Sequence, residues 1–425
     1  MNAVVSRLAN GFTVATDTMP GLKSVAIALY VKAGSRNERP EQNGIAHFLE
    51  HMAFKGTTTR SASDIARTIE DAGGSLNAYT SRDRTAYTVR ILSEDTALAI
   101  ELLADIVLNS TFAAEEIERE RKVIVNEIHQ YRDYPEEMVM EALQRMLYPD
   151  QAFGRPVIGT LEHVRGFGRG DLQGFIEEHY QPANMILVAA GDVDHARLLD
   201  LARGHFGHLD GVPVPPSEAP HFAGGESRQA KRVEQTQFVL AFEAPKLRSE
   251  MEIPALAWSV IMGYGSSSRL FDEVREKRGL CYSISAGYMP ALETGTMIIH
   301  AATRREDLRE LAECCIDEIR RSAMDLDEEE IRRARTQVRV GILMGYESPF
   351  NRVERAGGMI ASFDRIETIE ETNERFQAVT RDQIETYVRD MICNRDLSVA
   401  LYGPLGRAPR RAALQARLRA GPCWD

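Results

Sequence analysis

Two histidines and a glutamate near the N-terminus have the types and spacing of a metal-binding, acid–base site. His47 and His51 lie four residues apart in segment 43–56, which is predicted to be helical between two glycines. Residues at i and i+4 share one helix face, so both imidazoles can reach a single tetrahedral ion. Glu50 lies on the same face, where a carboxylate can act as a general base. The order His-x-x-Glu-His is the inverted form of a zinc-enzyme motif.

Five residues alone do not establish such a site, because His and Glu on an exposed helix face are usually just solvated. A catalytic zinc also needs a third protein ligand and an open position for water. Segment 111–128 offers Glu120 and Glu127, which lie two helical turns apart and therefore share a face. Glu127 interrupts an apolar run, where a carboxylate is either a paired structural charge or a ligand.

The second half of the chain repeats the first. The acidic start and apolar face of segment 111–128 recur at 325–342, and the apolar strand pattern at 184–191 recurs at 396–403, at nearly the same offset. Coincidence between two amphipathic helices would not reproduce the offset at two distant places. The chain is therefore predicted to be a tandem duplication.

The repeat helps to separate the two interpretations of the acidic residues. At the positions equivalent to Glu120 and Glu127, the second copy carries Ala334 and Gly341, and segment 255–262 contains no histidine. The fold therefore tolerates the loss of these groups, which indicates that the first copy keeps them for chemistry.

Each half is predicted to be an α+β domain, a mainly antiparallel sheet covered by helices. Segments 65–92 and 270–303 both run helix, glycine turn, strand, turn, strand and helix, with hairpin signals between the strands. Prolines and glycines interrupt any regular period between residues 209 and 232. We therefore predict domains at 1–208 and 233–425, joined by a linker at 209–232.

The composition is that of a globular protein that needs no membrane. Apolar residues make up 44% and charged residues 27%, and the longest apolar stretches have strand length, short of the ~20 residues that span a bilayer. Residues 1–7 lack a secretory signal, which predicts a cytoplasmic location unless a leader has been removed. A net charge of −12 disfavours nucleic acid and anionic lipid as partners.

The cysteines show no paired spacing of the kind that zinc ribbons or disulfide frameworks use, and they are predicted to be free thiols in a reducing compartment. They are Cys281, Cys314, Cys315, Cys393 and Cys423.

The sequence resembles the pitrilysin-type inverted-motif zinc peptidases of peptidase family M16. The similarity is greatest to their short-chain branch, which includes bacterial processing peptidases and the catalytic (beta) subunit of the mitochondrial processing peptidase. It covers essentially the whole chain, and it includes the spacing from His51 to Glu127 and the motifs at 73–79 and 180–185. The resemblance implies that both halves have the LuxS/MPP-like metallohydrolase fold.

The resemblance also assigns roles at the site. It implies that His47, His51 and Glu127 bind one Zn2+ per chain. Glu50 is then the catalytic base, and Glu120 is a second catalytic carboxylate that supports the ligands.

On the substrate side, the resemblance implies that the edge strand of hairpin 75–92 pairs with an extended peptide. The expected contacts are Asn77, Ala78 and Tyr79, with Phe54 as a pocket wall. Phe54 is equally consistent with an ordinary core residue, and Asn77 with a turn residue.

A second pair is implied in the other half of the chain. Arg275 and Tyr282 match the family's paired residues, seven apart, that grip the substrate backbone. Without the resemblance, Arg275 would be one more solvated charge in an ionic segment.

These features together predict a zinc metalloendopeptidase that hydrolyses extended peptides or small unfolded proteins with a zinc-activated water and Glu50 as general base. The alternatives are a non-catalytic scaffold subunit of a processing-peptidase-like complex and a metal lyase with the same motif on a much shorter fold. The intact motif argues against the first, and the duplicated chain argues against the second.

A homodimer is expected, in which the neighbouring chain completes each active site. The zinc motif and the Arg275–Tyr282 pair stand in one sequence, so two identical chains can build two sites. A heterodimer with an inactive homologue remains the alternative. The sequence does not identify the peptide substrate.

Overall fold

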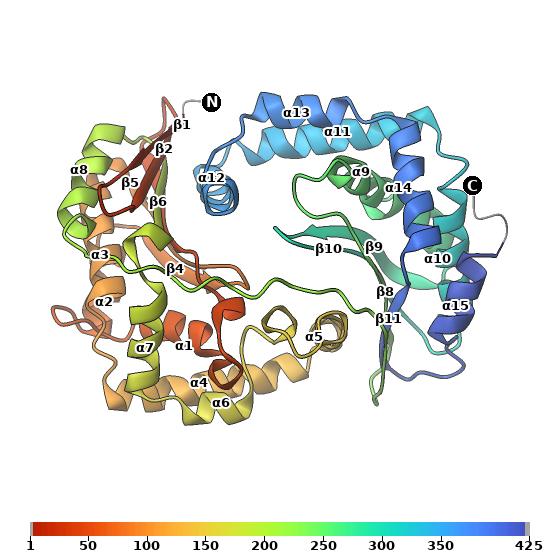
Figure 1. Ribbon diagram of the computed structural model, residues 1–425, viewed down its shortest axis with the longest axis horizontal. Helices are drawn as coiled ribbons and strands as arrows, with labels where there is room; N and C mark the ends of the chain where they lie inside the picture. The colour runs from red at the N-terminus through yellow and green to blue at the C-terminus, as the bar shows by residue number, and fades with distance from the viewer. Residues whose placement is uncertain (1–2, 421–425) are drawn as a thin grey trace. The chain divides into compact units, whose positions relative to one another are not determined.

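Two sheets with helices packed against them make up the protein, which we describe from a computed structural model over residues 3–420 (Figure 1). The chain divides into two compact units. Unit 1 comprises Met1–His129, Arg155–Glu218 and Ile342–Ile369, and unit 2 comprises Gln130–Gly154, Ala219–Gly341 and Glu370–Asp425. Each unit thus takes one segment from the other half of the chain.

The sheet of unit 1 has six strands in the order β1-β2-β6-β3-β5-β4. All neighbouring strands are antiparallel except β2 and β6, and β4 forms one edge. The strands are β1 (Ala3–Arg7), β2 (Thr13–Thr18), β3 (Ser24–Val31), β4 (Ser75–Thr80), β5 (Thr85–Leu92) and β6 (Met185–Gly191).

The sheet of unit 2 repeats this topology with one strand fewer, in the order β7-β11-β8-β10-β9. The parallel pair β7 and β11 takes the place of β2 and β6, and the remaining pairs are antiparallel. The strands are β7 (Glu226–Ala230), β8 (Thr236–Glu243), β9 (Cys281–Pro290), β10 (Gly295–Thr303) and β11 (Ser398–Gly403). Matching strand order and direction confirms the predicted duplication and the α+β class.

The helices also correspond in order along the two halves. Those before the midpoint are α1 (Ile45–Met52), α2 (Ala62–Glu70), α3 (Thr96–Leu108), α4 (Ala114–Arg132), α5 (Pro135–Leu147), α6 (Leu161–Gly166), α7 (Arg169–His179) and α8 (His195–Phe206). Those after it are α9 (Glu252–Gly263), α10 (Leu308–Arg321), α11 (Glu328–Gly345), α12 (Pro349–Phe363), α13 (Ile369–Gln377), α14 (Arg381–Asn394) and α15 (Arg411–Leu418). Short helical turns are η1 (Ser35–Asn37), η2 (Pro40–Gln42), η3 (Ser93–Asp95), η4 (Ala152–Gly154), η5 (Pro182–Asn184) and the π-helical η6 (Phe271–Glu276).

Strand alternation gives the unit 1 sheet two buried faces, and the side chains of β3 show how they differ. Leu29 and its alternate neighbours point into the main core with α1, α3 and α4. Ala26, Ala28 and Tyr30 point the other way and pack against Val353 and other apolar residues of α12. Small alanines on this face let the helix approach the sheet closely.

The two halves exchange equivalent helices. Helix α12 follows α11 and covers the unit 1 sheet, whereas α5 follows α4 and packs on β8 and β11 of the unit 2 sheet. Each sheet is therefore closed on one face by a helix from the other half. The domain boundaries predicted from sequence, 1–208 and 233–425 with a linker at 209–232, describe the two halves of the duplication. They stay a prediction.

Two further sequence predictions concern composition. Within residues 3–420, no helix is both long enough and apolar enough to cross a membrane. Four cysteines are free thiols, namely Cys281, Cys314, Cys315 and Cys393. Cys423 lies outside the described residues.

Candidate metal centre

Helix α1 presents the His-x-x-Glu-His residues because its other face is apolar. Ile45, Phe48, Leu49 and Met52 are buried in the unit 1 core. Residues His47, Glu50 and His51 therefore share the opposite, partly exposed face.

A buried carboxylate holds the start of α1 in place. The helix begins after Gly44, whose φ of 100° suits glycine and which has no side chain to cap the first turn. Glu38 accepts hydrogen bonds from the backbone N–H groups of Gly44 and Ala46 at 2.9 and 3.0 Å. Burial raises the pKa of Glu38 to about 8, although these hydrogen bonds favour its charged form.

Helix α4 places Glu120 and Glu127 beside the histidines of α1. Ile117, Ile124 and Ile128 pack into the unit 1 core. Glu127 lies beside both imidazoles, with its oxygens 3.8 Å from Nε2 of His47 and 3.5 Å from Nε2 of His51.

These three residues fit a zinc ion by geometry and by donor chemistry. Ligands about 2.05 Å from a tetrahedral zinc lie about 3.3 Å apart, close to the observed separations of 3.5 and 3.8 Å. One atom from each of His47, His51 and Glu127 lies within 4.8 Å of the others. Among residues 3–420, this is the one group of His, Cys, Asp and Glu with such convergence. Three protein ligands also leave the fourth position open, as catalysis requires.

Glu120 supports the cluster from behind. Its Oε2 lies 3.0 Å from Nδ1 of His51, which leaves Nε2 of that ring facing Glu127. Its Oε1 pairs with Nζ of Lys55 at 2.7 Å, and the carboxylate is nearly fully buried. A carboxylate bound to the second nitrogen of a ligating histidine orients the ring and raises its basicity.

The environment sets the protonation of the ligands. Burial and the neighbouring His51 lower the pKa of His47 to about 4, which keeps this imidazole neutral and able to bind a metal. The hydrogen bond from His51 lowers the pKa of Glu127, which keeps it ionised. For His51, burial is outweighed by Glu127 and Glu120, which raise its pKa.

Glu50 lies on the same face of α1 as the two histidines but is not among the three residues whose ligand atoms converge. Burial raises the pKa of Glu50, while the hydroxyl and backbone N–H of Thr80 at the end of β4 act in the opposite direction by hydrogen bonding. A carboxyl whose pKa is raised toward neutrality is a better general base than an ordinary glutamate. Thr80, which the sequence did not single out, thus joins the edge strand to this carboxylate.

Strand β4 places the predicted substrate residues on different faces. Asn77 is exposed, Ala78 is buried in the core, and the Tyr79 hydroxyl donates to Glu354 of α12. The three side chains therefore do not share one face of the sheet, and their contact with a substrate stays a prediction. Phe54 is half-buried and packs against the core, so its role as a pocket wall stays a prediction.

The second predicted pair comes together within unit 2. The Arg275 guanidinium lies 4.4 Å from the ring centre of Phe271 and 5.0 Å from that of Tyr282. Tyr282, at the start of edge strand β9, is 79% exposed. Arg275 therefore stacks on the ring of an accessible tyrosine, which places two polar donors at the end of a sheet edge.

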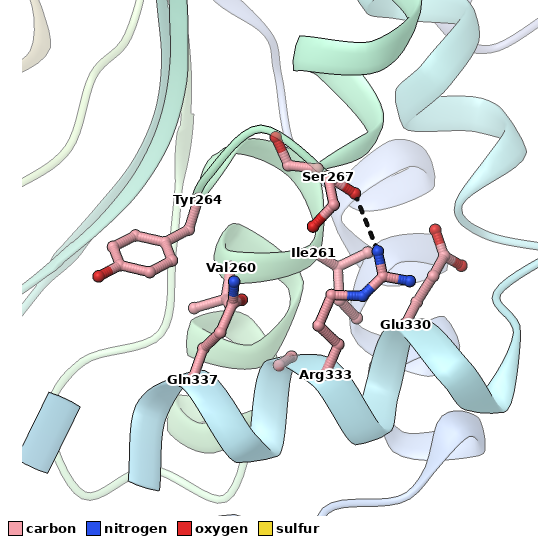
Figure 2. Close-up of a pocket in the computed structure, with 9 residues that line it drawn as sticks. Val260, Ile261, Tyr264, Ser267, Glu330, Arg333 and Gln337 are labelled. Carbon is pink, nitrogen blue, oxygen red and sulfur yellow. Dashed lines mark hydrogen bonds between the residues drawn. The ribbon is translucent and has the colours of Figure 1, made fainter. Parts of the chain in front are cut away.

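In unit 2, the position equivalent to the His47, His51 and Glu127 cluster is a pocket with apolar and polar lining residues. Helices α9 and α11 correspond to α1 and α4, and Figure 2 shows the pocket where they meet. Val260, Ile261 and Ala334 form its apolar part, and Arg333 donates to the carbonyl of Ser267 at 3.3 Å. The pocket lining contains no histidine, so this copy offers no comparable ligand set.

Sequence reasoning missed Glu38, Lys55, Thr80 and Glu354. Lys55 lies four residues after His51, and this spacing was the one available signal. The others come from separate segments that tertiary packing brings to the site.

Comparisons with known proteins agree with this fold. Residues 13–161 match the family described as Insulinase (Peptidase family M16), and residues 166–338 match the one described as Peptidase M16 inactive domain. A Rickettsia bellii protein described as an uncharacterized zinc protease is 39% identical over 405 residues, covering 95% of this chain and 98% of its own length. A Mycobacterium bovis protein, also described as an uncharacterized zinc protease, is 34% identical over 420 residues, covering 97% of this chain and 95% of its own length.

Solved structures share the fold at lower identity. A protease from Helicobacter pylori superposes with a TM-score of 0.87 at 20% identity, covering 94% of this chain and 99% of its own. A peptidase M16 inactive domain from Pseudomonas fluorescens superposes with a TM-score of 0.88 at 20% identity, covering 96% of this chain and 100% of its own. His47, His51 and Glu127 all lie within residues 13–161, the part of the chain that matches the Insulinase (Peptidase family M16) description. The chain belongs to peptidase family M16, as the sequence resemblance predicted.

Proposed function

We propose that this protein is a zinc metalloendopeptidase that hydrolyses peptide bonds in extended peptides or small unfolded proteins. The observation that carries the proposal is the convergence of His47, His51 and Glu127 beside Glu50, on the unit whose sheet ends in edge strand β4. A scaffold subunit would need none of these residues, and the hydrogen bond between Glu120 and Nδ1 of His51 is of the kind that orients a metal-binding histidine.

The residues of the chain divide the chemical work. Zinc, when held by His47, His51 and Glu127, would polarise the scissile carbonyl and acidify a water. Glu50 accepts the proton of the attacking water and returns it to the leaving amine nitrogen. Glu120 keeps the His51 ring oriented throughout.

The edge strand explains why extended peptides are the proposed substrates. An unfolded chain can add to β4 through main-chain hydrogen bonds, which are largely independent of side-chain identity. A folded protein cannot present such a strand without local unfolding. We therefore expect cleavage of unfolded peptides and resistance of folded proteins.

Removal of the metal should abolish activity reversibly. A strong chelator is expected to strip zinc and stop peptide cleavage, and one equivalent of zinc per chain should restore both. Metal analysis and cleavage of a quenched fluorescent peptide, measured on the same samples, test this. If the zinc-loaded wild type cleaves no peptide in a diverse library, the scaffold function is favoured instead.

We also propose a homodimer whose active sites each use both chains. The zinc residues and the Arg275–Tyr282 pair occur in one sequence, so twofold symmetry would give two complete sites. Glu50→Gln and Arg275→Ala chains, each inactive alone, should regain activity when mixed under conditions that allow exchange. The mixed dimer would hold one doubly defective site and one intact site. Demonstrated exchange without recovered activity would rule out shared sites.

A further inference from the structure

A carboxylate on α12 binds the edge strand of unit 1. Glu354 accepts a hydrogen bond from the Tyr79 hydroxyl on β4 at 2.6 Å, and another from the Tyr30 hydroxyl on β3 at 2.7 Å. Arg84, in the turn after β4, lies 3.6 Å from the same carboxylate. These four residues, the Glu354 cluster, thus join a helix of the second half of the chain to the edge strand of the first.

The helix is shaped for this contact. A Cβ atom on Gly357 would lie 2.1 Å from the Tyr30 ring, and one on Gly358 would lie 2.8 Å from Nη1 of Arg84. At position 357, glycine lets α12 approach closely enough for Glu354 to reach both tyrosines, whereas at position 358 the flexible Arg84 side chain could move aside. Burial raises the pKa of Tyr79 to about 12, so its hydroxyl stays protonated and donates at neutral pH.

The anchored residue lies next to the catalytic base. Tyr79 is followed by Thr80, and adjacent residues of a strand point to opposite faces. On the α1 side, the Thr80 hydroxyl donates to the Ala46 carbonyl at 3.5 Å, and Thr80 counteracts the raised pKa of Glu50, while Tyr79 is held on the α12 side. A single peptide unit therefore separates the contact with Glu354 from the contact with the base.

We propose that Glu354 is a positioning residue that, through the Tyr79 hydroxyl, holds the end of β4 where an extended peptide must pair beside Glu50. This inference rests on the proposed peptidase function. A strand at the edge of a sheet has one hydrogen-bonded neighbour and is the strand most free to shift or fray. Strand β5 holds β4 within the plane of the sheet, whereas the hydrogen bond to Glu354 holds it from the face covered by α12.

Two hydroxyls on one carboxylate provide a matched control. Tyr79→Phe and Tyr30→Phe each remove one hydrogen bond to Glu354, but Tyr30 lies on β3, which is paired on both sides. If Glu354 only fastens α12 to the sheet, the two variants should behave alike. If it positions β4, Tyr79→Phe alone should affect peptide binding.

The first measurement is hydrogen–deuterium exchange of the β4 amides, residues 75–80, in the zinc-loaded protein, which needs no turnover. Tyr79→Phe should raise their exchange rates about tenfold, since one hydrogen bond to a charged acceptor is lost. Tyr30→Phe should leave them within twofold of wild type. Glu354→Gln, which keeps an acceptor, should lie between wild type and Glu354→Ala. Equal exchange in the two Tyr→Phe variants would overturn the proposal.

The second measurement is kinetic. For a peptide of ten residues, Tyr79→Phe should raise KM about tenfold and change kcat less than twofold, while Tyr30→Phe should change neither. Binding of the same peptide to zinc-loaded Glu50→Gln, with and without Tyr79→Phe, reports this effect without cleavage. An inactive wild type would therefore contradict the proposed function only, whereas unchanged KM and peptide binding in Tyr79→Phe would contradict the role of Glu354.

Discussion

Glu50→Gln is expected to keep one zinc per chain and to lose peptidase activity by at least ~10²–10⁴-fold, the range attributed to a general base. The side chain is not among the three converging ligand atoms, so its replacement should not release the metal. The amide has nearly the same shape and cannot accept a proton at neutral pH. Because burial already raises the pKa of Glu50, a neutral side chain should leave the melting temperature equal or slightly higher.

Metal content, melting temperature and kcat of the same preparation test this expectation. Glu70→Gln is the matched control, since it makes the same substitution at an exposed residue of α2. It should keep wild-type zinc, stability and turnover. If Glu50→Gln retains more than about a tenth of wild-type kcat, Glu50 is not the base. If it loses the metal, Glu50 belongs to the ligand set and its assignment is wrong.

The duplication of the chain followed from sequence, but the exchange of helices between the two halves did not. The duplication was readable because the segments at 111–128 and 325–342 share a pattern, as do those at 184–191 and 396–403. Apolar periodicity in α5 and α12 shows that one face of each is buried, yet it does not say against which sheet. Two sheets of the same topology offer equivalent surfaces, so this choice depends on side-chain fit.

Gly357 illustrates that fit. Its missing side chain leaves room for the Tyr30 ring, which lies more than three hundred positions earlier in the chain. A glycine inside a helical pattern reads only as a weak position in that helix. Its use becomes visible once the sheet beside it is known.

The convergence of His47, His51 and Glu127 could be predicted because their spacing reflects helix geometry. His47, Glu50 and His51 follow from one helical turn, and Glu120 and Glu127 from two. The residues that position α1 and β4 lack such a signature, because Glu38 and Glu354 lie in separate segments and each accepts hydrogen bonds that only tertiary packing brings about. For Tyr79, strand alternation predicts the face of the sheet but not the contact. Strand alternation places Asn77 and Tyr79 on the face opposite Ala78, but it does not reveal that the Tyr79 hydroxyl is bound to Glu354 of α12.

The loss of a zinc ligand should have a different signature from the loss of the base. His47→Ala and Glu127→Ala are expected to lower zinc affinity more than ~100-fold and to abolish turnover. This exceeds the ~10–100-fold typical of a lost outer-shell partner, which we expect for Glu120→Ala. The three substitutions should therefore rank by distance from the ion: Glu120→Ala retains zinc when the metal is in excess, and the other two do not.

Folding should survive these changes, because the second copy of the repeat has Ala334 and Gly341 at the positions equivalent to Glu120 and Glu127 and still forms the same sheet. Zinc affinity measured against a competing chelator, with circular dichroism on each sample, separates metal loss from unfolding. Glu115→Ala, at an 88% exposed side chain of the same helix, is the matched control and should bind zinc like wild type. Stoichiometric, wild-type affinity in both His47→Ala and Glu127→Ala would refute the ligand assignment. Zinc loss equal to theirs in Glu120→Ala would move that residue into the ligand set.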